Sequence, residues 1–128
     1  MPPVVLDASA LLALLHRESG ADLVLRHLPG AQISAVNLSE VLVKLQENGM
    51  PAQEAEAACA MLPVAVRTFG SDEAKAAATL RLATRQAGLS LGDRACLGLA
   101  ASEQALAVTA DRSWATLDLG VEVLVIRS

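Results

Sequence analysis

The stretch Val4-Val5-Leu6-Asp7-Ala8-Ser9-Ala10-Leu11-Leu12 joins a short apolar run to an apolar helical pattern through a single carboxylate. In an open α/β sheet, such a junction lies at the carboxyl end of a strand, where ligands bind. A carboxylate at that place is costly unless it caps the helix or meets a cation. The stretch therefore predicts a strand–helix unit that carries Asp7 at the edge of a sheet.

Strand and helix patterns alternate along the rest of the chain. Many boundaries are marked by Gly or Pro, as at Pro29-Gly30, Asn48-Gly49 and Gly88. The predicted strands are 4–6, 31–34, 63–69, 106–109 and 121–126. The predicted helices are 9–16, 18–28, 36–48, 51–61, 71–86 and 90–103, and 111–117 is a loop or a short helix. We expect a three-layer α/β/α sandwich with a central, mostly parallel sheet of about five strands.

Composition limits the function classes. The length of 128 residues predicts one domain, residues 1–128, and the 53 % hydrophobic share comes mainly from Ala, Leu and Val. The aromatic share of 2 % argues against recognition of nucleic acid by base stacking. A net charge of −4 has the wrong sign for holding nucleic acid by counterion release alone. A nucleic-acid partner would therefore require a metal ion or a local basic patch.

The cysteines and the chain start predict a cytoplasmic protein. Cys59 and Cys96 lie far apart, each in an apolar helical context, and we interpret them as reduced core thiols. No apolar run approaches the roughly 18–20 residues of a membrane-spanning helix. Met1-Pro2-Pro3 lacks the basic region of a signal peptide. We therefore expect no membrane partner.

Four acids occupy positions from which they can converge on one edge of the predicted sheet. Asp7 and Asp111 each follow an apolar strand, and Asp93 lies in the first turn of a helix. Glu40 lies in the middle of a helix, opposite its apolar face. That face consists of Leu38, Val41, Leu42 and Leu45.

Each acid also has a purely structural explanation. Asp7 is a helix N-cap, a role compatible with metal binding. Asp93 completes a capping box with Ser90, and Asp111 is a turn residue or a cap. Glu40 is either an ordinary solvated side chain beside exposed valines or a partly buried carboxylate along a groove.

A joint site would have a definite chemistry. Clustered carboxylates repel and raise one another's pKa values unless a cation neutralises them. Oxygen-only ligands favour Mg²⁺ or Mn²⁺ over zinc. Such ions polarise a phosphoryl oxygen and generate hydroxide from bound water, which is the chemistry of phosphodiester hydrolysis.

The segments around the acids resemble, in order and spacing, the acidic motifs of PIN-domain ribonucleases, most closely VapC-type toxins of type II toxin–antitoxin pairs. The likeness covers essentially the whole chain. It is carried by VVLDASALLALL, SAVNLSEVLVKL, LSLGDRACLGLA and ALAVTADRSWA. The resemblance implies that the metal-binding, catalytic acids are Asp7, Glu40, Asp93 and Asp111.

The same resemblance implies the activity and the partners. Ser9 and Thr109 would be polar helpers, while Arg94 and Arg112 either contact phosphate or only solubilise their helices. The implied activity is that of a Mg²⁺- or Mn²⁺-dependent endoribonuclease, in which a metal-activated water hydrolyses RNA phosphodiester bonds. The implied partners are RNA, a cognate antitoxin that fills the acidic groove, and a second copy of the chain in a homodimer.

Other functions have less support from the residues. An aspartyl phosphatase wants a second acid two residues after Asp7, where Ser9 stands, and a receiver domain needs a late lysine, whereas the only lysines are Lys44 and Lys75. Phosphate-binding and dinucleotide-binding glycine motifs are absent, and the two histidines lack a matching triad. The serious alternative is a PIN-like module that binds a partner protein and does not cut.

Overall fold

The computed structural model describes residues 3–127, and they contain a five-stranded sheet in the order β3-β2-β1-β4-β5. Every neighbouring pair of strands is parallel. The strands are β1 (Val4–Leu6), β2 (Ala31–Ser34), β3 (Ala65–Arg67), β4 (Leu106–Thr109) and β5 (Val123–Val125). The predicted parallel sheet is confirmed.

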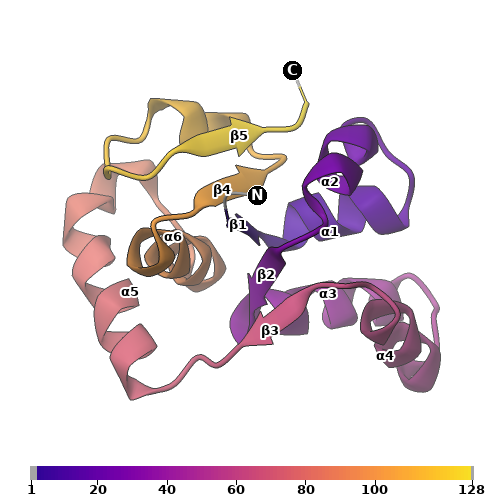
Figure 1. Cartoon of the computed structure of the whole chain (residues 1–128). Helices are drawn as coiled ribbons and strands as arrows, with labels where there is room; N and C mark the ends of the chain where they lie inside the picture. Colours follow the sequence, from indigo (N-terminus) through magenta and orange to yellow (C-terminus); the bar gives the residue numbers. More distant parts are fainter. Residues whose placement is uncertain (1–2, 128) are drawn as a thin grey trace.

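Helices cover both faces of this sheet, with α1 to α4 on one side and α5 and α6 on the other (Figure 1). They are α1 (Ala8–Leu15), α2 (Ala21–His27), α3 (Ala35–Glu47), α4 (Ala52–Ala60), α5 (Ser71–Ala83) and α6 (Leu91–Glu103). Two short 3₁₀ helices follow α5 and β4, namely η1 (Arg85–Ala87) and η2 (Arg112–Thr116). The three-layer α/β/α architecture is therefore confirmed as well.

The central strand β1 contributes to both cores. Val4 and Leu6 are buried against α1 to α4, whereas Val5 is buried with Trp114 and the apolar face of α6. Successive side chains of a strand point to opposite faces, so a strand covered on both faces needs a continuous apolar run. Burying each such side chain contributes about 1.5–3 kcal/mol.

Strands β3 and β5 are shorter than the predicted strands 63–69 and 121–126, and helices α2 and α5 are shorter than predicted for local reasons. Helix α2 begins at Ala21 because Gly20 adopts φ +95°, where a Cβ would lie 2.5 Å from the carbonyl oxygen of Ile126. Helix α5 ends at Ala83, and the hydroxyl of the next residue, Thr84, donates a hydrogen bond to the carbonyl of Leu80.

The thiols behave as expected from their helical contexts. Cys96 is buried, Cys59 is half-buried, and both are free. Among residues 3–127, no helix has both the length and the apolar character needed to cross a membrane.

Candidate functional site

Asp7 caps α1 and is almost completely buried, with 6 % of its surface exposed. Its Oδ1 accepts hydrogen bonds from the N–H of Ala10 at 2.8 Å and from the hydroxyl of Ser9 at 2.7 Å. Its Oδ2 accepts a hydrogen bond from the hydroxyl of Thr109 at the end of β4. The N-cap role is confirmed, and donors from two separate elements hold the carboxylate in place.

Ser9 and Thr109, the two expected polar helpers, both contact Asp7 and also bind the backbone that follows β4. Ser9 Oγ accepts from the N–H of Ala110 at 2.9 Å, and Thr109 Oγ1 accepts from the N–H of Asp111 at 3.0 Å. The start of α1 and the end of β4 are therefore joined through one polar network around the Asp7 carboxylate.

Burial raises the pKa of Asp7 from its ordinary value of 3.8 to about 6. The hydrogen bonds from Thr109, Ser9 and the Ala10 N–H lower the pKa, and the nearby charge of Asp93 raises it. The desolvation cost thus exceeds the gain from three donors. A carboxylate in this state gains free energy from a nearby cation.

Asp93 forms the predicted capping box at the start of α6. Its N–H donates to Ser90 Oγ at 3.1 Å, and its Oδ2 accepts from the N–H of Ser90 at 3.0 Å. The box engages one of the two carboxylate oxygens of Asp93 and fixes the orientation of the side chain.

Glu40 lies on α3, which begins directly at the end of β2. It is exposed at the residue level, yet Asn37 Nδ2 donates to its Oε1 at 3.0 Å. The same amide nitrogen donates to the carbonyl oxygen of Gly92 at 3.0 Å. The carboxylate is therefore held over the first turn of α6, the turn that carries Asp93.

The charges of three of these acids act on the buried thiol of Cys96. Complete burial raises the pKa of Cys96 well above its ordinary value, and the charges of Asp7, Asp93 and Glu40 raise it further. Asp93 lies in the first turn of α6 and the Glu40 carboxylate lies over the same turn, while the charge of Asp7 is near enough to act on the thiol beneath it. Within residues 3–127, however, no three acidic, His or Cys side chains lie close enough together to form a ready-made metal site.

Asp111 is joined to this group through the backbone, and its carboxylate has another partner. The carboxylate caps η2 by accepting from the N–H of Ser113 at 2.9 Å and from the Ser113 hydroxyl at 2.7 Å. The side chain is exposed, and its own N–H donates to Thr109, the residue that contacts Asp7. The cap explanation is confirmed for Asp111, which lies at the solvent-facing side of the network.

The comparison with protein-family models decides the family. The PIN-domain model matches residues 4–119, which is most of the chain. The chain belongs to the PIN-domain family. The resemblance inferred from the four acidic segments is thereby confirmed.

Solved structures of toxin–antitoxin proteins share the fold of this PIN domain. A toxin–antitoxin complex from Klebsiella pneumoniae is 22 % identical, with a TM-score of 0.73 over 94 % of this chain and 95 % of that one. DNA-bound VapBC from Salmonella typhimurium is 15 % identical, with a TM-score of 0.74 and coverages of 97 % and 98 %. The Mycobacterium tuberculosis toxin VapC20, described as sarcin–ricin loop cleaving, is 17 % identical, with a TM-score of 0.72 and coverages of 93 % and 98 %. Comparison with curated protein sequences gives no significant match.

The donor set of the PIN domain fits a hard divalent cation. The acids near the first turn of α6 supply carboxylates, which suit Mg²⁺ or Mn²⁺. The Cys96 thiol is completely buried in the apolar cluster that contains Val5, Leu97 and Trp114, and this burial raises its pKa. The chemistry of the donors thus argues against a zinc–thiolate site.

Arg94 and Arg112, for which phosphate contact and a merely solubilising role were both open, lie in different surroundings. Arg94 donates to the carbonyl oxygen of Ala77 at 2.9 Å and so joins α6 to α5. Arg112 is exposed at the start of η2, directly after Asp111.

Two residues of the site were not predicted from the sequence, namely Asn37 and Gly92. The spacing of Asn37 and Glu40 places them on one helix face, a signal available in the sequence. No such local signal exists for Gly92, whose contact with α3 spans 55 residues.

Replacing Asp7 with asparagine should change the stability of the metal-free protein in a pH-dependent way. The folded protein keeps the Asp7 proton up to about pH 6, whereas the unfolded chain releases it near 3.8. The folded state therefore binds more protons between these values, and stability is lost as the pH rises through about 6. We expect the stability of Asp7→Asn relative to wild type to rise by about 2–3 kcal/mol between about pH 4 and about pH 8.

Urea denaturation with excess chelator at both pH values measures this difference. The asparagine oxygen can still accept from Ser9 and from the N–H of Ala10, whereas the bond from Thr109 to Oδ2 is lost at every pH. The change of the stability difference with pH therefore reports the charge. A stability difference that does not change with pH would contradict the assignment of the buried charge to Asp7.

Proposed function

We propose that this PIN domain is a divalent-metal-dependent endoribonuclease whose acidic residues are Asp7, Glu40, Asp93 and Asp111. The observation that carries the proposal is that the Glu40 carboxylate lies over Gly92, the residue before Asp93, and that Asp93 lies near enough to Asp7 to raise its pKa. These three acids come from the end of β1, the middle of α3 and the start of α6. Acids brought together from such distant positions indicate a site for a cation and its anionic ligand.

The protein's own residues prepare the site before a cation binds. Donors from α1 and β4 fix Asp7, the capping box fixes Asp93, and Asn37 fixes Glu40. Oriented groups of this kind need little reorganisation during a reaction. Asp111 is exposed and can exchange its bonds to Ser113 for a cation.

PIN-family nucleases generally use a divalent metal ion, and Mg²⁺ or Mn²⁺, when bound, supplies phosphoryl polarisation and a lowered pKa of water. The proposed ligands for that ion are Asp7, Glu40, Asp93 and Asp111. A bound cation also makes an acidic site able to accept an anion, which reconciles the net charge of −4 with an RNA substrate. Arg112, exposed beside Asp111, is a proposed phosphate contact.

RNA cleavage by the purified, partner-free protein tests the proposal. We expect cleavage with Mg²⁺ or Mn²⁺, none with excess chelator, and a loss of about 100-fold or more in Asp93→Asn. Thermal stability of Asp93→Asn should change little, because the asparagine oxygen can still accept from the N–H of Ser90.

Glu73→Gln is the matched control. Glu73 occupies the same third position of α5 and accepts from the N–H of Gly70 at 2.8 Å. Its substitution removes a capping charge without touching the acidic site. Cleavage that survives Asp93→Asn would make Asp93 a cap only, and the absence of both cleavage and calorimetric metal binding would favour the non-catalytic binding module.

We also propose that the protein is a toxin held inactive by an antitoxin. The similar structures include a toxin–antitoxin complex and DNA-bound VapBC.

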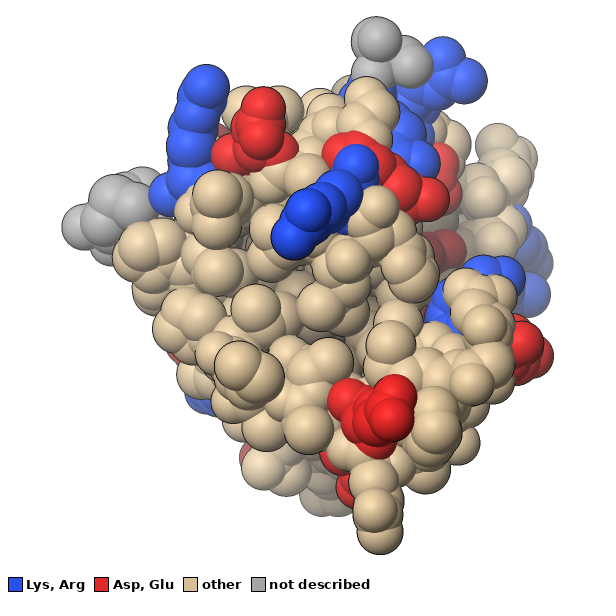
Figure 2. Space-filling view, turned by 90° about the vertical axis from the view of Figure 1, so that its right-hand side faces the viewer, with Lys and Arg blue, Asp and Glu red and all other residues tan. Residues whose placement is uncertain are grey.

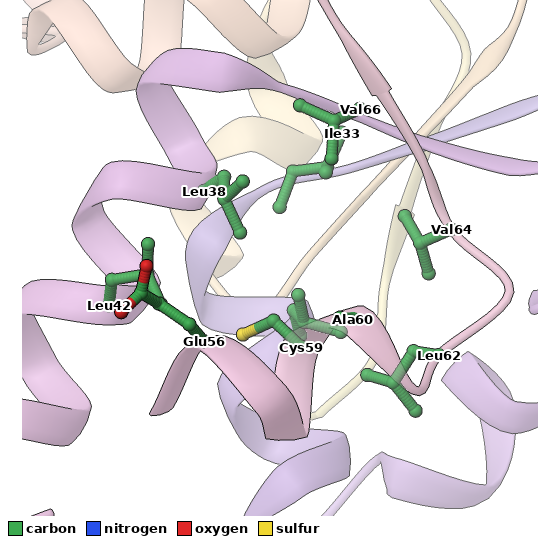
Figure 3. Close-up of a pocket in the computed structure, with 10 residues that line it drawn as sticks. Ile33, Leu38, Leu42, Glu56, Cys59, Ala60, Leu62, Val64 and Val66 are labelled. Carbon is green, nitrogen blue, oxygen red and sulfur yellow. The ribbon is translucent and has the colours of Figure 1, made fainter. Parts of the chain in front are cut away.

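An apolar surface supports a protein partner. The side formed by α1 to α4 has few charged residues in its middle, and charged side chains gather along its upper edge (Figure 2). A cavity of about 280 Å³ opens between α3, α4 and β3. Figure 3 shows its lining, which includes Leu38, Leu42, Cys59, Leu62, Val64 and Val66.

Growth of cells that express the chain tests the toxin role. We expect expression to arrest growth, Asp93→Asn to abolish the arrest, and co-expression of a short reading frame directly upstream of the gene to relieve it. Co-purification of that product with both wild type and Asp93→Asn would distinguish an antitoxin from an unrelated suppressor. Growth arrest that persists in Asp93→Asn would mean that the toxicity does not depend on the proposed cleavage.

A homodimer is the third part of the proposal. Apolar side chains are exposed on α5 and α6, which lie on the same side of the sheet, with Leu82 72 % and Leu91 49 % exposed. Exposed apolar residues on one side of a protein favour an interface between protein chains.

Light scattering should therefore give the mass of a dimer. We expect Leu82→Glu to weaken the dimer by about tenfold or more, because it places a charge in the interface. Leu25→Glu, at a residue that is 57 % exposed on α2, is the matched control and should leave the mass unchanged. A monomeric wild-type protein at micromolar concentration would contradict this part of the proposal.

A further inference from the structure

Asn37 occupies an unusual place between two helices. It is 1 % exposed in the first turn of α3, and its Nδ2 donates to Glu40 Oε1 and to the Gly92 carbonyl, each at 3.0 Å. Both partners are acceptors only, so the orientation of the amide is determined by its surroundings. An aspartate at this position could not make either bond.

Gly92 leaves the space that the Glu40 carboxylate occupies. A Cβ at position 92 would lie 2.3 Å from Oε2, 2.5 Å from Oε1 and 2.6 Å from Cδ of Glu40. Gly92 lies within the first turn of α6 and has an ordinary helical backbone. The space for the carboxylate therefore comes from the missing side chain of Gly92. Any other residue at 92 would displace the carboxylate.

We propose that Asn37 and Gly92 are positioning residues that place the Glu40 carboxylate beside Asp93. Asn37 supplies the donor that holds the carboxylate, and Gly92 supplies the room for it. Their role toward a divalent cation rests on the proposed function, whereas their hold on Glu40 does not depend on it.

A role limited to joining α3 and α6 explains these residues less well. Asn37 Oδ1 is buried and finds no hydrogen-bond partner among residues 3–127. A buried amide that leaves its acceptor unpaired is a costly way to join two helices. Both N–H groups of the Asn37 amide donate hydrogen bonds, one to the Gly92 carbonyl and the other to the Glu40 carboxylate. The bond to Glu40 is one that joining the two helices does not require.

Binding of Mn²⁺ to Gly92→Ala, measured by calorimetry, tests the proposal. We expect the affinity to fall by about tenfold or more, as for other groups that orient metal ligands. The thermal midpoint should not fall, because the displaced carboxylate is the far end of a flexible side chain and alanine favours the helix. Gly98→Ala is the matched control in the same helix, since its nearest atoms are Leu80 Cδ1 at 3.8 Å and Ala76 Cβ at 4.0 Å.

A double-substitution cycle separates positioning from a structural role. If Gly92 and Asn37 act through Glu40, then Gly92→Ala and Asn37→Ala should cause no further loss of Mn²⁺ affinity in a Glu40→Ala background. A loss of the same size in both backgrounds would overturn the proposal, as would Gly92→Ala binding Mn²⁺ as tightly as wild type.

A metal-free measurement keeps this inference distinct from the proposed function. The side-chain carboxyl carbon resonance of Glu40, identified by its loss in Glu40→Ala, should shift in Gly92→Ala and in Asn37→Ala and not in Gly98→Ala. This shift in the variants, together with wild-type protein that binds no Mn²⁺, would refute the metal site and retain the positioning roles. An unchanged Glu40 resonance in Gly92→Ala would overturn the positioning roles themselves.

Discussion

The arrangement of the site depends on a single buried carboxylate at the end of the central strand. Asp7 is acceptable there only because Ser9, Ala10 and Thr109 donate hydrogen bonds to it. Two of these donors belong to α1, and the third lies at the end of β4. The carboxylate is therefore satisfied only when β1 and β4 are paired in register, which links the chemistry of the site to the topology of the sheet.

The sheet order then brings the other acids to the same edge. Strand β1 lies between β2 and β4, so α3 starts beside Asp7 and the segment with Asp111 follows on the other side. Helix α6 approaches the same edge with its first turn, where Asp93 and Gly92 lie. The pKa of Asp7 remains raised even with its three donors, so part of the cost of burying charge stays uncompensated in the metal-free protein. A buried charge of this kind lowers the stability of the folded protein.

Most of the fold was predictable because it follows from local patterns. Apolar runs and the glycine or proline residues between them located every strand, and their alternation with helices predicted the parallel sheet. Errors occurred where a single residue ended a helix, as at Thr84, or delayed its start, as at Gly20. The local positions of three of the acids, as caps at strand ends or in a first helical turn, were also predicted, whereas their joint role as a metal site stays a prediction.

The roles within the acidic group depend on contacts that no local pattern encodes. Capping motifs near Asp7 and Asp93 are visible in the chain because their partners lie two or three residues away. The contact that holds Glu40 against α6 spans 55 residues, and it requires α3 and α6 to pack at one particular separation. Periodicity and spacing describe one helix at a time, so only the packing of the two helices reveals why an amide stands at position 37 and a glycine at position 92.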